Sequence, residues 1–518
     1  MVNLRKSLWG KGYQPKLVQV PQTDYKELVR VGLDRFTESA AGFAKPVYFI
    51  VASVELGNTT TKCILTATNL REQKIYLLNK TVRLTKEMRS PLPGEEVFGE
   101  TVWKKELTVN AVKEFIRDTL LQCLEEAKID KDRDLHFVVR STGVTAGFAT
   151  PEEVGAMIHA LAQGCLAAGI SSSKMVAPLT KEHVPKELRE YSLLDKVPFD
   201  GSVAGSLPPR TPGQVIANEM EAELSTAGLK MGARWIGFDF RNPVVAMDFG
   251  TTLKGRITDK SSPYAQTVGS IAGLGGAIPD ALVQGAGLVD AENGSVLEAR
   301  AEEAGGRRVS GGWEDWVEDA LKHLRIMAIP PDSSRFGTVP VNPKAAREAA
   351  VFLIGCDIGV NGSNIPKLRR LGEKIRREQG LPALFRVIDA LMARVASRIV
   401  ELAMEAGLIG ADVSIGLTGR AGITGEKPQA FLKLVDDLGL YPRGAVSDRV
   451  VFVEDALALG AGVMSRCMFS LGTPKKPLGG RRGEPCILAK RMKYLEKTAA
   501  WTPQHLKELK TSPAAREE

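Results

Sequence analysis

Residues 54–69, VELGNTTTKCILTATN, place one glycine and three threonines between two apolar runs. The first run carries an acid near its end, Glu55, and the second begins with Lys62. Tight hairpin turns favour glycine and asparagine because these residues accept positive φ, so one such turn needs no ligand to explain it. The stretch therefore predicts a β-hairpin and leaves open whether its polar tip also binds a ligand.

The same order of residue types returns in PVVAMDFGTTLKGRITDKS, which begins at Pro243. The aligned residues are Glu55 with Asp248, Gly57 with Gly250, Thr59 with Thr252 and, within one residue, Lys62 with Lys254. The offset between the copies is too long for a solenoid repeat and is typical of a duplicated domain. We therefore predict two related domains, each opening with a hairpin of this kind.

Two such hairpins facing each other suit a phosphate chain. Glycine lets backbone N–H groups approach phosphate, threonine adds donors without charge, and lysine supplies the counter-charge. An acid at the same place would repel phosphate unless a cation lay between them, so Glu55 and Asp248 are interpreted as catalytic residues that hold Mg²⁺ through water. The predicted phosphate-binding residues are Gly57, Asn58, Thr59, Thr60, Lys62, Gly250, Thr251, Thr252 and Lys254.

The first predicted domain begins at Lys45. Apolar runs over 45–56, 62–70 and 74–84 predict three consecutive strands. A helix is expected over 108–128, a strand in LHFVVRS, and a further helix from Pro151, since proline favours the first helical position. The order β-β-β-α-β-α predicts an α/β domain built on a mixed sheet.

Five segments are predicted along the chain. They are a leader over 1–44 with at most one helix and no strand, a first domain over 45–170, an insertion rich in Pro and Gly over 171–242, a second domain over 243–472 and a basic tail over 473–518. In the second domain a long amphipathic helix is expected over 383–406.

Composition and charge narrow the class of protein. Of the 518 residues 44% are hydrophobic and 25% charged, and no apolar run reaches the roughly 18 residues of a membrane helix, so a cytoplasmic protein without a membrane contact is expected. Most of the net charge of +8 lies between Lys475 and Lys497, so no nucleic-acid groove is expected on the body of the protein. The six cysteines form no C-x-x-C, so no iron–sulfur cluster is evident within one chain.

The two hairpins resemble those of the superfamily of acetate kinase, sugar kinases, heat-shock ATPases and actin, in which each of two domains opens with D-x-G-T/S-T and ATP lies between them. The stretch GLTGRAG, residues 416–422, resembles the adenosine loop of that superfamily. The resemblance implies two actin-like (ribonuclease H-like) α/β domains with mixed sheets around a nucleotide cleft, with ATP and Mg²⁺ as cofactors. It adds Gly416, Thr418, Gly419, Arg420 and Gly422 to the expected nucleotide site.

Three further stretches are similar to ATP-dependent activators of corrinoid proteins and of 2-hydroxyacyl-CoA dehydratases. They are STGVTAGF at 141–148, LGLYP at 438–442 and VVFVEDALALGAG at 450–462. The whole chain also resembles the methanogenesis marker protein fourteen family of archaea. The resemblance implies an ATPase whose domain closure assists maturation or reductive activation of a metalloenzyme or cofactor protein, with a protein partner and a homodimer as an option. A nucleotide-dependent scaffold with negligible hydrolysis and a small-molecule kinase stay open as alternatives.

Several other polar residues have a plainer interpretation. Asp357, in GCDIGVNG, is typical of a residue that caps a turn. Glu219 is expected on a solvated helix face, and Asp455 at the N-cap of the last helix, with an adenosine contact as the other option. The five histidines show no metal-ligand spacing and are assigned no chemistry.

Overall fold

The computed structural model describes the greater part of the chain. The described residues are 13–28, 48–69, 74–144, 148, 150–175, 203–204, 219–260, 265, 267–299, 312–348 and 350–469. The basic tail and most of the predicted leader lie outside them, as do residues 145–147 of STGVTAGF.

The first sheet has the strand order β4-β3-β2-β7-β8. Its strands are β2 (Tyr48–Leu56), β3 (Thr60–Asn69), β4 (Ile75–Leu84), β7 (Phe137–Thr142) and β8 (Val203–Ala204). β2, β3 and β4 form an antiparallel meander, and β7 joins β2 in parallel. The helices α2 (Val109–Glu126) and α3 (Pro151–Ala167) share one apolar core with this sheet. The predicted elements of the first domain are present in the predicted order, and the structure adds two short strands, β5 (Val97–Glu100) and β6 (Glu106–Thr108), between β4 and α2.

The second sheet has eight strands in the order β1-β17-β16-β9-β10-β11-β15-β12. They are β1 (Leu17–Val18), β17 (Val450–Val453), β16 (Ser414–Thr418), β9 (Val244–Phe249), β10 (Thr252–Thr258), β11 (Thr267–Leu274), β15 (Phe352–Asp357) and β12 (Arg325–Ala328). Its largest core lies against the helices α5 (Ala277–Gly285), α6 (Trp313–Leu321), α8 (Ile365–Gln379), α9 (Leu381–Glu405) and α11 (Lys427–Asp437). α9 corresponds to the long amphipathic helix expected from the sequence.

The two sheets repeat one pattern of strand pairing. The order β4-β3-β2-β7 in the first sheet corresponds to β11-β10-β9-β16 in the second. In each case an antiparallel meander is followed by a parallel neighbour on the side of its first strand. The predicted α/β class with two related units and mixed sheets is therefore confirmed, because the duplication seen in the hairpins extends over four strands.

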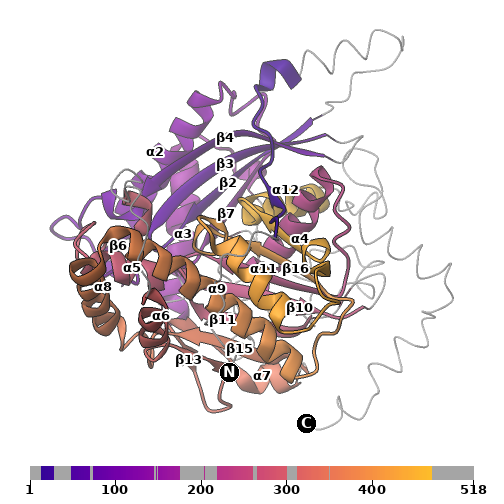
Figure 1. Cartoon of the computed structure of the whole chain (residues 1–518). Coiled ribbons are helices and arrows are strands. Elements are labelled where there is room, and N and C mark those ends of the chain that lie inside the picture. The colour runs from indigo at the N-terminus through magenta and orange to yellow at the C-terminus, as the bar shows by residue number, and fades with distance from the viewer. Residues whose placement is uncertain are drawn as a thin grey trace.

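Two helices, α4 (Glu219–Trp235) and α12 (Ala456–Phe469), lie between the sheets (Figure 1). They cross closely at glycines: a Cβ on Gly228 would lie 1.7 Å from a backbone oxygen of α12, and one on Gly460 would lie 1.7 Å from a backbone oxygen of α4. On its other side α12 faces the first sheet, where a Cβ on Gly462 would lie 2.9 Å from the side chain of Ile75. α4 falls within the segment predicted as an insertion, but it packs as part of the layer that joins the two sheets.

The described part of the leader contains a strand, contrary to the prediction. Leu17 and Val18 form β1, which pairs in parallel with β17 at the edge of the second sheet. A few residues later, Gln22 forms a bridge with Leu77 of the first sheet. A strand of two residues is too short to show an alternating pattern, so no periodicity in the sequence predicts it.

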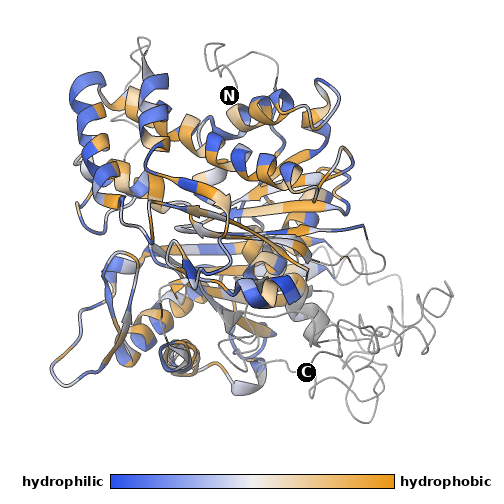
Figure 2. Ribbon diagram, turned by 90° about the horizontal axis from the view of Figure 1, so that it is seen from below, coloured by the Kyte–Doolittle hydropathy of each residue, from blue (hydrophilic) through white to orange (hydrophobic). Residues whose placement is uncertain are grey.

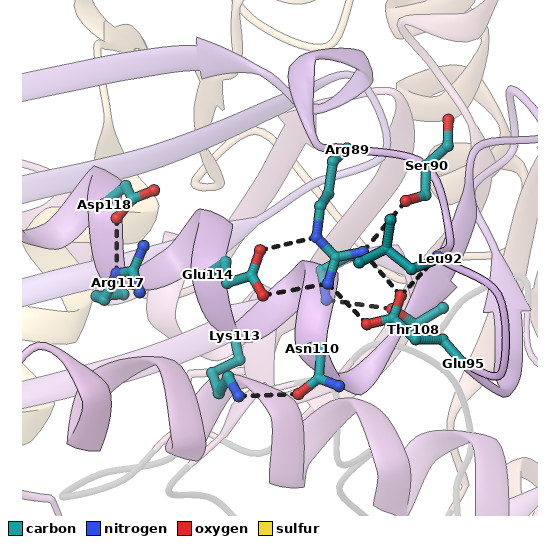
Figure 3. A network of polar contacts seen from close by, with 11 residues as sticks. Arg89, Ser90, Leu92, Glu95, Thr108, Asn110, Lys113, Glu114, Arg117 and Asp118 are labelled. Atoms are coloured by element: carbon teal, nitrogen blue, oxygen red, sulfur yellow. Dashed lines mark hydrogen bonds and ion pairs between the residues drawn. The ribbon is translucent and has the colours of Figure 1, made fainter.

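Ionic contacts of Arg89 hold the small hairpin formed by β5 (Val97–Glu100) and β6 (Glu106–Thr108) against α2 (Figure 3). Arg89 donates to Glu114 of α2 (2.7 Å) and to both oxygens of Glu95 (2.7 Å each). Thr108 accepts from the amide of Ala111 as the N-cap of α2, and its hydroxyl donates to Glu95. These contacts hold the pKa of Glu95 well below its usual range, chiefly through Arg89. The contacts of Arg89 thereby position the loop between β5 and β6, which contains Trp103 of the site described below.

The remaining elements are short. They are η1 (Thr85–Glu87), η3 (Ser172–Lys174), η7 (Val296–Glu298), β13 (Arg335–Phe336), β14 (Val339–Pro340), α7 (Pro343–Glu348), α10 (Arg420–Ile423) and η9 (Ala445–Asp448). Apolar residues concentrate on the strands and on the inner sides of the helices, with polar residues outside (Figure 2). Within the described ranges, no helix combines the length and the apolar character needed to cross a membrane.

Candidate functional site

The tip of the first hairpin is the turn between β2 and β3. The Gly57 amide donates to the Thr60 carbonyl (3.0 Å), and a Cβ at Gly57 would lie 2.6 Å from that oxygen, so the close turn requires glycine. The Asn58 side chain accepts from the amide of Val102 (2.8 Å) and donates to the carbonyl of Gly143 (3.1 Å). Asn58, predicted as a phosphate ligand, therefore ties together two loops of its own domain.

The acid and the lysine of the first hairpin face each other across the strands. Glu55 is the register partner of Lys62, and the Lys62 Nζ lies 3.9 Å from Glu55 Oε2. Their side chains are 18% and 27% exposed, respectively. This pair is therefore the part of the site that remains in contact with solvent.

The tip of the second hairpin, Gly250 and Thr251, binds the start of α5. The Gly250 carbonyl accepts from the amide of Gly276 (2.6 Å), and the Thr251 carbonyl accepts from that of Ala277 (3.2 Å). The first amides of a helix have no partner within the helix and would otherwise attract an anion. Because the hairpin already satisfies these two amides, they do not form a phosphate site here.

The lysine of the second hairpin is buried among carboxylates. Lys254 is the register partner of Asp248, and its Nζ lies 2.5 Å from Glu221 of α4 and 3.9 Å from Glu55 of the first hairpin. Burial alone would lower the pKa of Lys254, but the carboxylates of Glu221, Asp248 and Glu55 together hold it above its usual value. Lys254 is therefore a permanent cation that links the two hairpins.

The acid of the second hairpin is enclosed as well. The Ser225 hydroxyl, from α4, donates to Asp248 Oδ2 (3.0 Å), and a Cβ on Gly419 would lie 2.7 Å from Asp248 Oδ1. Gly419 has φ +82, a second reason why this loop position requires glycine. Burial, the largest effect, raises the pKa of Asp248 above its usual range, and the nearby charge of Lys254 opposes that shift.

The two hairpin tips touch. Thr59 Oγ1 lies 2.8 Å from Thr251 Oγ1, so a residue of each predicted phosphate loop contacts the other loop. The indole Nε1 of Trp103, from the loop between β5 and β6, donates to Thr59 Oγ1 (3.0 Å). Trp103 itself packs into the core of the second sheet, 5% exposed. The side chain of Trp103, from the first half of the chain, thus packs in the core of the second half, beside the hairpin contact.

A buried carboxyl group, Asp280 of α5, lies next to this contact. Its Oδ2 lies 3.4 Å from Thr59 Oγ1, while its Oδ1 accepts from the hydroxyl of Ser295 and the amide of Val296, both at 2.9 Å. Burial raises the pKa of Asp280 to about 7, although these hydrogen bonds favour the charged form. A proton therefore resides on this group at pH values where an exposed aspartate has lost it.

The predicted adenosine loop reaches the site only in part. Thr418 is the register partner of Asp248, and Gly419 packs against the same carboxylate. Gly416 instead lies inside β16, where a Cβ would meet side chains of α4 and of the segment after it at 2.8 Å. Gly422 packs on an aromatic ring of β9, where a Cβ would lie 2.8 Å from a ring carbon. Close packing accounts for these two glycines.

Arg420 and Asp455 belong to a separate ionic cluster. Arg420, whose side chain is 48% exposed, lies 3.6 Å from Glu454. Lys80 of β4 pairs with Glu454 (3.1 Å) and with Asp455 (2.5 Å). Asp455 has φ 54, and its carboxylate pairs with this lysine. The cluster links the first sheet to the loop before α12.

The remaining polar candidate, Asp357, caps a turn as expected. It is fully buried and accepts from the amides of Ile358 (2.7 Å), Asn361 (2.7 Å) and Gly362 (3.1 Å). Of Glu219 the structure describes only its place as the first residue of α4.

The residues present fit a hydrated cation better than a directly coordinated one. Among the described residues, no group of three or more His, Cys, Asp and Glu side chains is arranged to hold a metal ion. The site nevertheless gathers three carboxylates, Glu55, Asp248 and Glu221, against the two lysines Lys62 and Lys254. With all five ionised, one negative charge is left over, which suits Mg²⁺ held through its waters.

Four residues of the site were missed by the sequence analysis: Glu221, Ser225, Trp103 and Asp280. Glu221 and Ser225 lie four positions apart on α4, so they share one helix face and reach Lys254 and Asp248 from the same side. That spacing was the only available signal, and it is common on solvated helices.

The comparisons with known proteins give a family. The model of a family described as "Uncharacterized protein conserved in archaea (DUF2114)" matches residues 48–495. An uncharacterized protein of Methanocaldococcus jannaschii is 51% identical over 447 residues, which cover 86% of this chain and 91% of the relative. One of Methanothermobacter thermautotrophicus is 52% identical over 453 residues, which cover 86% of this chain and 83% of the relative.

Two solved structures are similar to this chain, both with low sequence identity and a low TM-score. The ethanolamine utilization protein EutJ from Carboxydothermus hydrogenoformans has 10% identity and a TM-score of 0.33, with 85% of this chain and 96% of that chain covered. A reductive activator for a corrinoid, iron–sulfur protein has 11% identity and a TM-score of 0.30, with 82% and 61% covered. Both TM-scores are below 0.5, so the fold assignment rests on the strand order of this chain.

Proposed function

This chain belongs to the family of uncharacterized proteins conserved in archaea, and we propose that its members bind a magnesium nucleotide between the two β-hairpins. One observation carries the proposal: the cross-strand pair of acid and lysine occurs in both hairpins, and the two pairs meet. Glu55 faces Lys62, Asp248 faces Lys254, and Lys254 reaches within 3.9 Å of Glu55. The second pair, Asp248 and Lys254, is buried, and a duplicated charge arrangement with one buried copy is costly for folding alone and is typical of a functional site.

In this proposal the side chains have distinct roles. Lys62, the more exposed lysine, meets the phosphates, and Lys254 stays bound to its carboxylates and fixes the spacing of the two acids. Glu55 and Asp248 hold the waters of Mg²⁺, which when bound neutralises phosphate charge and so favours phosphoryl transfer to water. No protein side chain attacks phosphate, and catalysis consists of positioning and charge neutralisation.

Phosphate binding between the tips requires that they separate. In the structure Thr59 and Thr251 are in hydrogen-bond contact, and Trp103 and Asp280 both lie against Thr59. We infer that the nucleotide replaces the contact between the threonines and thereby moves Trp103. A ligand shifts such an equilibrium only by its differential affinity for the two forms, so the contact should weaken the apparent nucleotide affinity.

We propose that this change in the hairpins acts on a partner protein. The sequence resemblance to ATP-dependent activators favours a metalloenzyme or cofactor protein, with methanogenesis as one context. A nucleotide-dependent scaffold would bind ATP at the same site without turnover, so a measurement of phosphate release by the pure protein separates these two functions.

A small-molecule kinase is less favoured by the geometry. It needs a carboxylate base that faces an acceptor. Asp280 is a buried carboxyl in contact with the first tip, but one of its oxygens binds Ser295 and Val296 and the other faces Thr59. Its oxygens therefore serve contacts within the chain.

Isothermal titration with ADP and with ATP, each with and without Mg²⁺, tests the proposal. We expect one site per chain and tighter binding with Mg²⁺. Lys62→Met should weaken nucleotide binding by about tenfold or more, since it removes a charge-assisted hydrogen bond. Lys427→Met is the matched control, because Lys427 is also paired with an acid, Asp389 at 2.6 Å, but lies on α11. Absence of binding by both nucleotides at millimolar concentration would refute the proposal.

A further inference from the structure

The charged pairs extend into rows of three residues. In the first sheet Lys62, Glu55 and Ser141 are register partners across β3, β2 and β7. In the second sheet Lys254, Asp248 and Thr418 occupy the corresponding positions across β10, β9 and β16. Both rows therefore read lysine, acid, hydroxyl, and the hydroxyl belongs to the strand that runs parallel to the acid's strand.

The two hydroxyl groups differ in their partners. Thr418 Oγ1 accepts from the amide of Ala456 at the start of α12 (3.3 Å). Ser141 is 1% exposed, and in the described part of the chain its Oγ has no hydrogen-bond partner. Buried hydroxyl groups are normally hydrogen-bonded, because leaving one unpaired costs free energy. Ser141 thus carries an unused donor and acceptor at the position where its counterpart is bound.

The Ser141 side chain points to the proposed nucleotide site. Register partners in a sheet project to the same face, so Ser141 lies beside Glu55 on the side where Lys62 also lies. Two residues later, a Cβ on Gly143 would lie 3.4 Å from Thr252 Oγ1 and 3.6 Å from Lys254 Nζ. The residue that follows β7 therefore lies beside the second hairpin, two positions after Ser141.

We propose that Ser141 and Glu55 together bind one water of a hydrated divalent cation, so that Ser141 is a further binding residue of the site. This inference rests on the proposed function. Neighbouring strands lie about 4.8 Å apart, and a water with hydrogen bonds of about 2.8 Å to each side spans that gap. The water donates to the Glu55 carboxylate and accepts from, or donates to, the Ser141 hydroxyl.

The chemistry of the row selects a cation's water over a phosphate oxygen. The carboxylate of Glu55 repels an anion at this position, whereas it attracts the polarised hydrogens of water bound to a cation. The Ser141 hydroxyl adds no charge and fixes the water from the other side. The lysine end of the row, Lys62, is left for the phosphates.

The test compares ADP binding with and without Mg²⁺ by isothermal titration of the full chain and of Ser141→Ala. In the wild type, Mg²⁺ should tighten ADP binding. In Ser141→Ala this enhancement should fall about five- to tenfold, the size of one hydrogen bond, while binding of metal-free ADP stays within about twofold. The thermal midpoint should not fall, because the substitution removes an unpaired buried hydroxyl.

Thr66→Val is the matched control. Thr66 is also 1% exposed with an unpaired Oγ1, on the same face of the first sheet but away from the row. Its variant should keep both the thermal midpoint and the full Mg²⁺ enhancement. Glu55→Gln should weaken the enhancement, and adding Ser141→Ala to it should change little more, since both residues hold one water.

The outcomes separate the two proposals. If the wild type binds no ADP, the proposed function itself fails. If the wild type shows the Mg²⁺ enhancement and Ser141→Ala keeps it, the inference about Ser141 is wrong. It is equally wrong if Ser141→Ala weakens metal-free and metal-bound ADP alike, or if the variant unfolds at a lower temperature, because the hydroxyl would then serve the phosphates or the chain itself.

Discussion

Replacement of Asp280 by asparagine should remove a pH dependence from the stability of the protein. Asp280 is buried, and burial raises its pKa from 3.8 to about 7. Asparagine keeps the shape of the side chain and the oxygen that can accept from Ser295 and Val296, but it cannot ionise. The variant therefore removes the ionisation of residue 280 while it keeps the packing of the side chain.

The sign of the effect follows from the raised pKa. Below about pH 4 Asp280 is protonated in both the folded and the unfolded chain, and its contribution to stability is fully present. As the pH rises, the unfolded chain loses its proton first, so the contribution declines and is lost as the pH passes the folded pKa of about 7. With about 1.4 kcal/mol for each pKa unit, the wild type should lose about 2 kcal/mol of unfolding free energy between pH 5.5 and 7.5 through this group.

The assay is scanning calorimetry of the wild type and Asp280→Asn at pH 5.5, 6.5 and 7.5. The difference between the two proteins cancels every other titrating group, so it should shift by about 2 kcal/mol in favour of the variant over this range. Asp134→Asn is a control at another buried acid, whose pKa is lowered rather than raised. A constant difference between the wild type and Asp280→Asn would refute the claim that this carboxyl holds its proton near neutral pH.

Three further substitutions test the packing around the hairpins. Glu221→Gln should lower the unfolding free energy by about 3 kcal/mol, measured by calorimetry, because it removes one partner of the buried pair with Lys254; no loss would mean that the pair is not formed. Trp103→Phe should lower the unfolding free energy by about 1 kcal/mol, because the hydrogen bond to Thr59 is lost. It should also abolish the change in tryptophan fluorescence that the nucleotide induces; a change that persists would mean that another tryptophan reports it. Gly228→Ala should destabilise by about 1–3 kcal/mol or more, since its Cβ would lie 1.7 Å from a backbone oxygen of α12, and a thermal midpoint equal to that of the wild type would contradict the close helix crossing.

Local patterns predicted much of the fold. The three-strand meander, the strand before STGVTAGF and both hairpins followed from apolar runs and turn residues, because these elements form between neighbours in the chain. The correspondence of Glu55 and Asp248 also held, because each acid faces a lysine across its hairpin. The two lysines align only within one residue because the second turn is one residue shorter than the first.

Contacts over long distances in the sequence were not predictable in this way. In the sequence Glu221 resembles any acid of a surface helix. Only the packing of α4 beside β10 brings it to Lys254. The contact of Thr59 with Thr251 depends on how the two halves meet, which no local pattern specifies. Gly416 matched a nucleotide-loop motif, but its position inside β16 requires glycine for packing against α4.

The most direct test of the central claim is hydrogen exchange of the backbone amides in residues 54–62 and 248–254, measured with and without Mg-ADP. If the nucleotide binds between the two hairpins, both segments should change their exchange rates together, and the change should be smaller at the same ADP concentration when Mg²⁺ is left out. A protein that binds Mg-ADP while both hairpins exchange as in the free chain would contradict the account, because the nucleotide would then lie elsewhere.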